Sequence, residues 1–458
     1  MRSRRTYRFS LVNLGCPKNT VDSEGLLGSL ALAGFRFVED PADADLCVVN
    51  TCGFLDAARR EAAGVLRELA LLRGKRNRPK LVATGCLVER AGGAPELSEF
   101  LAAADARAGF RDYARLPELC RELLEGTGRE GGSAKGFAGR ELPRSYFAFL
   151  DRPRMRIGFP GSAYLKLGEG CSNHCAYCSI PLIRGQRASR PMKAIWKEAR
   201  ELVEAGAREL NLIAQDTTAY GLDRTGRPQL ADLLRGLLKM PGELWFRLLY
   251  AHPRHLDEEM LAVMVSDVRV CPYLDLPLQH ITDRMLKAMG RGYGRKHAEE
   301  VLEGVRRHWP DAAIRTTFIV GHPGEREADF QELLKFVGEG RFDHLGVFAW
   351  SPEPGTASVN LGGRVPPSLA EARRDELMRT QAGVSAKRLR ARRGQETSML
   401  LEEETSKGWR GRTVWQAPEV DGNTLLEGPV TGAHSGRMIR VILTGAGRYD
   451  CRARSAEG

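Results

Sequence analysis

Short apolar runs alternate with helical stretches over the first part of the chain. The runs at residues 9–14, 45–50 and 80–84 predict buried strands, and the stretches 20–33 and 55–72 predict helices between them. Strands that alternate with helices are typical of a parallel sheet covered by helices. We therefore predict a small parallel α/β domain over residues 6–124.

The pattern breaks after this domain. Residues 126–139 are rich in glycine, serine and charged residues and show no apolar period, and prolines follow at positions 143, 153 and 160. Such composition between patterned segments is typical of linkers. Residues 125–160 are therefore predicted to join two domains.

Alternation resumes on a larger scale after residue 161. Helical stretches such as 193–205 and 328–337 lie between six candidate strands, at residues 163–167, 209–213, 245–249, 273–276, 314–320 and 344–348. Six strand–helix units predict a partial (β/α)6 barrel over residues 161–393, with its active site at the carboxyl ends of the strands. A long basic helix, residues 369–393, ends this domain.

A third pattern begins at residue 394. Short β-like stretches at 398–402, 412–416 and 437–443 are separated by glycine, aspartate and asparagine turns. They predict a small all-β barrel over residues 394–455, close to the size limit for independent folding. The predicted fold class is α/β, with a parallel N-terminal domain, a central partial barrel and a C-terminal β barrel.

Composition and charge narrow the class of protein. The 458 residues include 69 lysines and arginines against 58 aspartates and glutamates, which gives a net charge of +11. This excess favours a nucleic-acid or ribosomal partner, although arginine-rich proteins from GC-rich genomes often carry a similar charge. No apolar run approaches the roughly 20 residues that span a bilayer, and the basic N-terminus lacks the apolar core of a signal peptide. We expect a cytoplasmic protein without a membrane partner.

The ten cysteines carry more specific information. Disulfides are rare in the cytosol, so clustered cysteines in such a chain indicate a metal site or catalysis. Six cysteines lie in sequence segments that follow predicted strands. The other four are predicted to be small buried residues or incidental thiols: Cys47, Cys120, Cys271 and Cys451.

The central cysteine triplet follows a predicted strand and the glycines at 168 and 170. Three residues separate Cys171 from Cys175, and two separate Cys175 from Cys178. This spacing lets a compact loop bring three thiolates to one face of an iron–sulfur cube. One iron of a four-iron cluster then has no protein ligand, and an open metal position is typical of a catalytic site. The alternative is zinc, whose fourth ligand would have to be His174 in an awkward geometry.

This triplet resembles the motif of the radical S-adenosylmethionine (SAM) superfamily. The resemblance implies that the open iron binds the amino and carboxylate groups of SAM, and that one electron splits the sulfonium to give a 5′-deoxyadenosyl radical. Tyr177 occupies the aromatic position expected near the adenine. Residues 319–325, with Gly321 and Pro323, resemble the later strand motif that contacts the adenine.

Two further positions bear on this resemblance. Thr317 departs from the family pattern, which often has glycine there. Gln215 and Asp216 come at the end of the second predicted strand of the central domain. Their position favours contact with the methionine or ribose part of SAM.

A second cysteine triplet is spread over the N-terminal domain. Cys16, Cys52 and Cys86 each follow a predicted strand. The carboxyl ends of parallel strands meet at one edge of a sheet, where α/β folds bind ligands, so these three thiols are predicted to converge. The alternative is three buried structural thiols. Flanking glycines would let the backbone approach a bulky cluster: Gly15, Gly53 and Gly85.

Taken together, these segments resemble the radical SAM methylthiotransferases. The resemblance rests on three segments: Gly-Cys-Pro-Lys-Asn-Thr-Val-Asp-Ser-Glu at 15–24, Asn-Thr-Cys-Gly-Phe at 50–54 and the central triplet. The resemblance covers nearly the whole chain and implies two four-iron clusters and a C-terminal TRAM domain. Three segments resemble the branch that modifies ribosomal protein S-twelve, at residues 16–19, 213–218 and 415–422. The tRNA-modifying branch typically has Cys-Gln-Met-Asn at the first of these segments.

The resemblance also implies a reaction, the conversion of C–H to C–SCH₃ at the β-carbon of an aspartate in that ribosomal protein. The central cluster would generate the radical, the N-terminal cluster would hold the sulfur, and a second SAM would supply the methyl group. The implied partners are the ribosomal protein, free or in the small subunit, and a low-potential electron donor such as flavodoxin or ferredoxin. No catalytic residue is assigned beyond the predicted metal ligands, which are Cys16, Cys52, Cys86, Cys171, Cys175 and Cys178.

Two other functions remain open from the sequence. One is methylthiolation of an N6-modified adenosine in tRNA, which the positive net charge would suit. The other is a non-catalytic iron–sulfur carrier with an RNA-binding tail. Basic strands in a small β barrel commonly contact RNA. The C-terminal arginines are predicted to contact RNA or to help dock a protein substrate: Arg410, Arg412, Arg437 and Arg440.

Overall fold

The computed structural model describes residues 6–74, 77–127 and 144–456. Its N-terminal domain is built on a five-stranded parallel sheet in the order β2-β1-β3-β4-β5. The strands are β1 (Arg8–Asn13), β2 (Arg36–Phe37), β3 (Leu46–Thr51), β4 (Lys80–Gly85) and β5 (Ala106–Ala108). The three predicted strands are the central β1, β3 and β4. The edge strands β2 and β5 are too short for a residue period to predict them.

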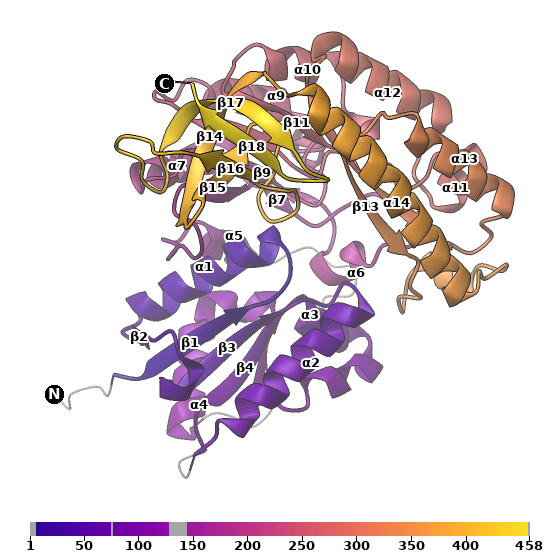
Figure 1. Cartoon of the computed structure of the whole chain (residues 1–458). Helices are drawn as coiled ribbons and strands as arrows, with labels where there is room; N and C mark the ends of the chain where they lie inside the picture. Colours follow the sequence, from indigo (N-terminus) through magenta and orange to yellow (C-terminus); the bar gives the residue numbers. More distant parts are fainter. Residues whose placement is uncertain (1–5, 75–76, 128–143, 457–458) are drawn as a thin grey trace.

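Helices cover both faces of this sheet (Figure 1). They are α1 (Pro17–Leu32), α2 (Asp56–Leu71), α3 (Cys86–Gly93) and α4 (Leu116–Glu125), with the 3-10 turns η1 (Pro41–Asp43), η2 (Pro95–Leu101) and η3 (Phe110–Arg115). Proline suits the first turn of α1, where a backbone N–H would have no partner. Helix α1 is buried along most of its length, because it packs against both the N-terminal sheet and the central domain.

Part of the predicted linker is folded. Residues 128–143 lie outside the described residues, but α5 (Arg144–Leu150) follows them. Its Tyr146 and Phe149 are buried against Phe110 and Tyr113, with ring centroids 5.1 Å apart for Tyr113 and Phe149. Four aromatic side chains from two segments thus form one core, a contact that local composition does not predict.

The central domain contains a six-stranded parallel sheet in the order β13-β12-β11-β10-β9-β6. All six predicted strands are present: β6 (Ser162–Lys166), β9 (Glu209–Ile213), β10 (Trp245–Leu248), β11 (Val270–Asp275), β12 (Ala313–Val320) and β13 (His344–Ala349). A short antiparallel pair, β7 (Gly168–Glu169) and β8 (Ala188–Ser189), follows β6. The sheet is open, as expected for a partial barrel.

Helices connect these strands. They are α6 (Ile180–Arg184), α7 (Met192–Glu204), α8 (Leu222–Thr225), α9 (Leu230–Leu237), α10 (Glu258–Val265), α11 (Asp283–Ala288), α12 (Arg295–His308), α13 (Glu327–Gly338) and α14 (Pro367–Ala391), with η4 (Pro253–His255) and η5 (Ala357–Asn360). Alternate strand residues divide the core. Phe246 and Leu248 pack under the helices, while Trp245 and Leu249 face a second core shared with the other two domains.

The C-terminal domain is a closed five-stranded barrel in the order β14-β15-β16-β18-β17. Its strands are β14 (Glu396–Thr405), β15 (Gly408–Thr413), β16 (Thr424–Glu427), β17 (Met438–Ala446) and β18 (Cys451–Ser455). The predicted strand 412–416 is wrong beyond Thr413, because a turn begins there and Gln416 donates its backbone N–H to the Thr413 carbonyl at 3.1 Å. The barrel packs on the inner face of the central sheet (Figure 1).

Two predictions about general character can be compared with this fold. Cys47, Cys120, Cys271 and Cys451 are all buried, as expected for structural thiols. Within residues 6–74, 77–127 and 144–456, no helix combines the length and apolar character needed to cross a membrane.

Candidate metal centre between the N-terminal and central domains

The N-terminal cysteines follow the carboxyl ends of three neighbouring strands, β1, β3 and β4. Glycine lets these strand ends approach closely. A Cβ atom on Gly15 would lie 2.9 Å from the Cβ of Cys52, and one on Gly53 would lie 2.8 Å from the backbone carbonyl carbon of Cys86. Side chains at these positions would separate the three loops, so the glycines bring the thiols to one edge of the sheet.

Asn19 ties the same loops together. Its side-chain amide donates to the carbonyl oxygens of Leu14 at 2.9 Å and Thr51 at 3.0 Å. Its backbone carbonyl accepts a hydrogen bond from the Asn50 side chain at 2.9 Å. The asparagine of the Cys-Pro-Lys-Asn segment therefore links the loop that carries Cys16 to the strand that precedes Cys52.

The central triplet lies on the loop between β7 and α6. Asn173 in this loop donates to the Asp216 carboxylate at 2.8 Å. Arg291 donates to the Cys175 sulfur and to the Tyr177 hydroxyl, both at 3.2 Å. Asp216 therefore positions the cysteine loop, a role that differs from the predicted contact with SAM.

Both triplets line a single cavity of about 370 Å³. It lies where the carboxyl ends of the N-terminal strands meet the carboxyl ends of the central strands. Phe54, Ile183 and Phe348 contribute apolar walls. The structure thus brings together six cysteines that belong to two domains and span more than 160 positions of the sequence: Cys16, Cys52, Cys86, Cys171, Cys175 and Cys178.

The thiols of neither triplet lie close enough together in this structure to share one zinc ion. Zinc–sulfur bonds are about 2.3 Å long, so thiolates that share one tetrahedral zinc lie about 3.8 Å apart. Among the described residues, the only three or more His, Cys, Asp or Glu ligand atoms within 4.8 Å of one another are those of Asp216, His252 and His255. At least one sulfur pair in each triplet is therefore more widely spaced. This spacing suits a cube of several metal ions better than a single ion.

Burial keeps most of these thiols protonated while they hold no metal. It raises the pKa of the Cys86 thiol to about 12, although Arg184 acts in the opposite direction, and that of the Cys171 thiol to about 11. Burial also raises the pKa values of Cys52 and Cys178. Metal ligands are thiolates, so metal binding must release these protons.

Two glutamine side chains give the cavity hydrogen-bond acceptors. Gln215 and Gln279 both line it, and the Oε1 atom of each is buried with no hydrogen-bond partner in the described parts of the chain. The ammonium and ribose hydroxyl groups of SAM are donors that match such oxygens. Tyr177 and Thr317 also line the cavity. Gly321 and Pro323 do not, and their contact with SAM stays a prediction.

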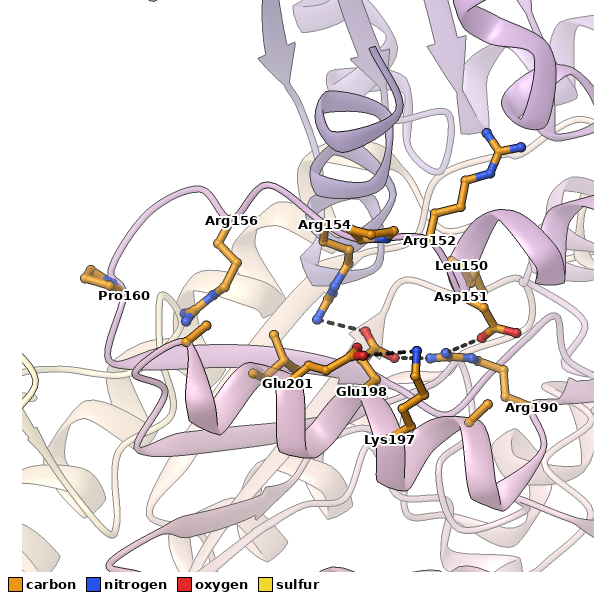
Figure 2. A pocket seen from close by; sticks show the side chains of 14 residues that line it. Leu150, Asp151, Arg152, Arg154, Arg156, Pro160, Arg190, Lys197, Glu198 and Glu201 are labelled. Atoms are coloured by element: carbon orange, nitrogen blue, oxygen red, sulfur yellow. Dashed lines mark hydrogen bonds and ion pairs between the residues drawn. The ribbon is translucent and has the colours of Figure 1, made fainter. Parts of the chain in front are cut away.

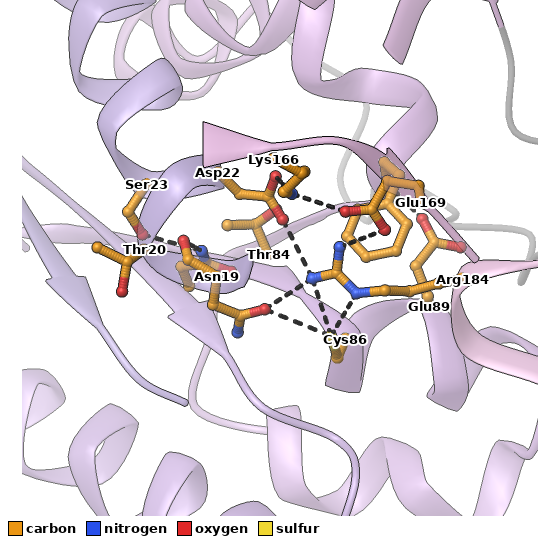
Figure 3. A network of polar contacts seen from close by, with 12 residues as sticks. Asn19, Thr20, Asp22, Ser23, Thr84, Cys86, Glu89, Lys166, Glu169 and Arg184 are labelled. Atoms are coloured by element: carbon orange, nitrogen blue, oxygen red, sulfur yellow. Dashed lines mark hydrogen bonds and ion pairs between the residues drawn. The ribbon is translucent and has the colours of Figure 1, made fainter. Parts of the chain in front are cut away.

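Arg184 lies at the centre of a buried network that joins the two domains (Figure 3). It donates to the carboxylates of Asp22 at 3.1 Å and Glu169 at 2.7 Å, and to the Cys86 sulfur at 3.3 and 3.4 Å. Lys166 pairs with the same carboxylates at 2.6 and 2.7 Å. Burial would raise the pKa of Glu169, but Arg184 and Lys166 outweigh it and hold that pKa at about 2. A cation of the central domain therefore contacts a thiol of the N-terminal triplet.

Lys18 adds another cation to the cavity wall. Its Nζ atom lies 2.8 Å from the centroid of the Tyr250 ring. Burial lowers the pKa of Lys18 to about 8, against the opposing effect of the neighbouring Cys16 and Asp275 side chains. The ammonium is therefore still the main form at neutral pH.

A larger cavity, of about 720 Å³, lies between α7 and residues 150–160 (Figure 2). None of the six cysteines lines it. Three of its cations already have carboxylate partners within 4 Å: Arg154, Arg190 and Lys197. Its size does not indicate the reactive site, and we place no chemistry there.

A second buried network holds the β barrel on the central sheet. Arg412 donates to the two carboxylate oxygens of Glu209 at 3.0 and 2.6 Å, and Arg247 donates to the same carboxylate at 2.8 Å. Burial would raise the pKa of Glu209, but the two arginines hold it well below its usual value. The Arg412 side chain is only 2% exposed, so the prediction that it contacts RNA or a substrate protein is wrong.

The other barrel arginines are less available than their number suggests. Arg410 pairs with Glu403, and Arg440 pairs with Glu396. The segment 415–422 is also structural, because Asp421 accepts hydrogen bonds from the Tyr273 hydroxyl at 2.7 Å and from the backbone of residue 417 at 2.9 Å. Residues 415–422, which resemble one branch of a family, thus hold the barrel against the central sheet.

Several site residues escaped the sequence analysis, namely Lys18, Glu169, Arg184, Gln279 and Arg291. Lys18 lies inside the quoted segment 15–24 and Glu169 lies between the two glycines that precede the central triplet, so their position was a signal. Gln279 has a left-handed backbone, with φ of 73°, which is unusual for a residue other than glycine. Arg184 and Arg291 stand in segments without any motif.

Comparison with known families accounts for all three domains. The family models that match are an uncharacterized protein family, UPF0004, over residues 8–107, the radical SAM superfamily over residues 165–337, and the TRAM domain over residues 394–455. The fold and the central triplet thus define a radical SAM enzyme with a C-terminal TRAM barrel.

Curated relatives narrow this class. A protein from an Anaeromyxobacter strain (Fw109-5), "Ribosomal protein uS12 methylthiotransferase RimO", is 41% identical over 97% of this chain and 92% of its own length. A protein of the same name from Citrifermentans bemidjiense is 40% identical over 98% of each chain. The chain therefore belongs to the RimO family of radical SAM methylthiotransferases, and it is a transferase.

Solved structures share the fold at low identity. The radical SAM methyltransferase TsrM from Kitasatospora setae, solved with cobalamin and a four-iron cluster, matches with a TM-score of 0.57 and 17% identity over 77% of each chain. The cobalamin-dependent radical enzyme OxsB matches with a TM-score of 0.51 and 12% identity, over 82% of this chain and 56% of that one. These two likenesses show the fold alone.

Proposed function

We propose that this enzyme inserts a methylthio group at the β-carbon of an aspartate in ribosomal protein uS12, that is, protein S-twelve of the small subunit. The observation that carries the proposal is the single cavity lined by both cysteine triplets. Sulfur insertion at an unactivated carbon requires a radical source and a sulfur source at the same substrate atom, and a shared cavity meets this requirement. The uS12 substrate is supported by the names of relatives that match over almost the whole chain.

The proposal gives the two triplets different roles. Cys171, Cys175 and Cys178 would hold a four-iron cluster that supplies the radical from SAM, and the N-terminal triplet would hold a second cluster that supplies the sulfur. Arg291 and Arg184 donate hydrogen bonds to one thiol of each triplet. Such bonds to ligand sulfur stabilise negative charge and raise a cluster's reduction potential.

The remaining cavity residues would bind and shield the reactants. The free acceptor oxygens of Gln215 and Gln279 suit the ammonium or hydroxyl groups of SAM, and Tyr177 suits its adenine. The apolar walls exclude water, which protects a carbon radical from side reactions. Flavodoxin or ferredoxin would supply low-potential electrons, and we place the enzyme in the cytoplasm with its ribosomal substrate.

The test is anaerobic reconstitution followed by turnover with a peptide that spans the candidate aspartate. We expect about eight irons per chain, as two four-iron clusters require, together with 5′-deoxyadenosine and a peptide in which one hydrogen is replaced by a methylthio group. A loading of about four irons would contradict the two-cluster assignment. A protein that forms no 5′-deoxyadenosine would instead be the non-catalytic carrier.

A deletion strain distinguishes a uS12 substrate from a tRNA substrate. Mass spectrometry of uS12 and of tRNA from a deletion strain should show loss of the methylthio group from the protein alone. If uS12 keeps the group and a tRNA adenosine loses it, the substrate assignment is wrong.

A further inference from the structure

Lys18 is a buried cation that has no carboxylate partner among the described residues. It belongs to the first turn of α1, its residue is 6% exposed, and it lines the cavity between the triplets. Over the part of the chain that the structure describes, Nζ makes no hydrogen bond or ion pair, and its contact is the face of the Tyr250 ring at 2.8 Å. An aromatic face replaces only part of the hydration that a buried ammonium loses.

Other buried cations at this interface are matched by acceptors. Lys166 and Arg184 share the carboxylates of Asp22 and Glu169. Arg291, which also lines the cavity, donates to a thiol, two phenol oxygens and a backbone carbonyl. Among the described residues Lys18 is the exception, so its ammonium is available to a group that enters the cavity.

The carboxyl groups near Lys18 make their hydrogen bonds and ion pairs with other residues. Asp275 accepts a hydrogen bond from the Tyr250 backbone at 3.0 Å and lies 3.9 Å from Arg315. Glu169 is held by the two cations of the Arg184 network. Because α1 begins beside the cavity, the positive end of its dipole adds to the ammonium charge. This part of the cavity therefore carries a positive charge that one anion would neutralise.

We propose that Lys18 binds the carboxylate of the substrate side chain and so makes the site selective for an acidic residue. This inference rests on the proposed function and deepens it. Lys18 is two positions after Cys16 and faces the same cavity, so a carboxylate on its ammonium lies beside the N-terminal triplet. In aspartate the reacting β-carbon is bonded directly to the carboxylate. Anchoring that group holds the β-carbon in the cavity that both triplets line.

The test uses the full chain, reconstituted anaerobically with SAM, and two peptides that differ only in aspartate or asparagine at the candidate position. Dissociation constants are measured for each. We expect the wild type to bind the aspartate peptide about 10- to 100-fold more tightly, the effect of one charge-assisted hydrogen bond. In Lys18→Met, which keeps most of the side chain's length but not its charge, the two peptides should bind with about equal dissociation constants.

Two further variants make the test specific. Lys18→Arg keeps a cation and should retain most of the preference for aspartate. Lys197→Met removes an exposed lysine that pairs with Glu201 at 3.0 Å and should behave as the wild type. Iron content and circular dichroism verify that every variant compared is folded and loaded.

The possible failures are distinguishable. If Lys18→Met keeps the wild-type preference, Lys18 is not the partner of the carboxylate, even if the peptide is still modified. If the wild type prefers neither peptide and methylthiolates tRNA, the proposed function itself is wrong and the inference falls with it.

Discussion

Replacing Arg412 with methionine should loosen the β barrel from the central domain. Arg412 makes two hydrogen bonds to Glu209, one to Glu402 at 2.6 Å and one to the carbonyl of Gln416 at 3.2 Å. Methionine fills similar volume without a charge. After the change, Glu209 keeps its bonds to the side chains of residues 247 and 162, at 2.8 and 2.7 Å, but it loses its bidentate partner.

The magnitude follows from burial. Removing one member of a buried ion pair typically costs about 3–5 kcal/mol when the remaining charge is left unpaired in a region that excludes water. Arg247 still pairs with the Glu209 carboxylate at 2.8 Å, so we expect the low end of this range, about 3 kcal/mol. Arg410, two positions earlier on the same strand, is the matched control. It pairs with Glu403, and both side chains are more than half exposed, so Arg410→Met should cost less than about 1 kcal/mol.

Hydrogen exchange of the barrel peptides measures this difference directly. A loss of about 3 kcal/mol in docking should speed exchange in β14 and β15 by roughly two orders of magnitude in Arg412→Met, with little change in the N-terminal sheet. Urea unfolding should show the barrel transition at lower denaturant. Equal exchange in Arg412→Met and Arg410→Met would refute the view that this ion pair docks the barrel.

Three further outcomes are expected. Cys86→Ser should lower bound iron from about eight to about four per chain, whereas Cys47→Ser, a buried thiol outside both triplets, should leave iron unchanged; equal iron in the two variants would argue against Cys86 as a ligand. Arg184→Lys should make the reduction potential of the N-terminal cluster more negative, because N–H donors to its ligand sulfur are lost; an unchanged potential in an EPR-monitored titration would contradict this role. Burial raises the pKa of Glu89 to about 7, so its contribution to stability is complete below its unfolded value near 4.5 and is lost as pH rises through 7. Glu89→Gln should flatten the unfolding free energy between pH 5 and pH 8 by up to about 3 kcal/mol, and an unaltered pH slope would count against it.

The sequence predicted the elements best where a residue pattern is local. The buried strand β3 is a nearly continuous apolar run, buried and partly buried residues alternate along most of β12, and the longer helices show their period. The same logic placed three cysteines at the ends of parallel strands, because strand direction alone determines which ends share an edge. Strand β5 and helix α5 were missed because a few residues with no clear period carry little signal.

The sequence by itself therefore determined the order of the domains, the alternation of strands and helices, and the two cysteine triplets with their convergence within each domain. Only the tertiary structure decided that both triplets face one cavity, that Lys18 lines it with no carboxylate partner among the described residues, and that Arg412 is buried on Glu209. The physical reason is the distance along the chain over which each kind of interaction acts. Periodicity and strand direction act over neighbouring residues, whereas the partner of a buried charge is set by the packing of whole domains. The Arg412 and Glu209 positions are 203 residues apart, and no local pattern records that they meet.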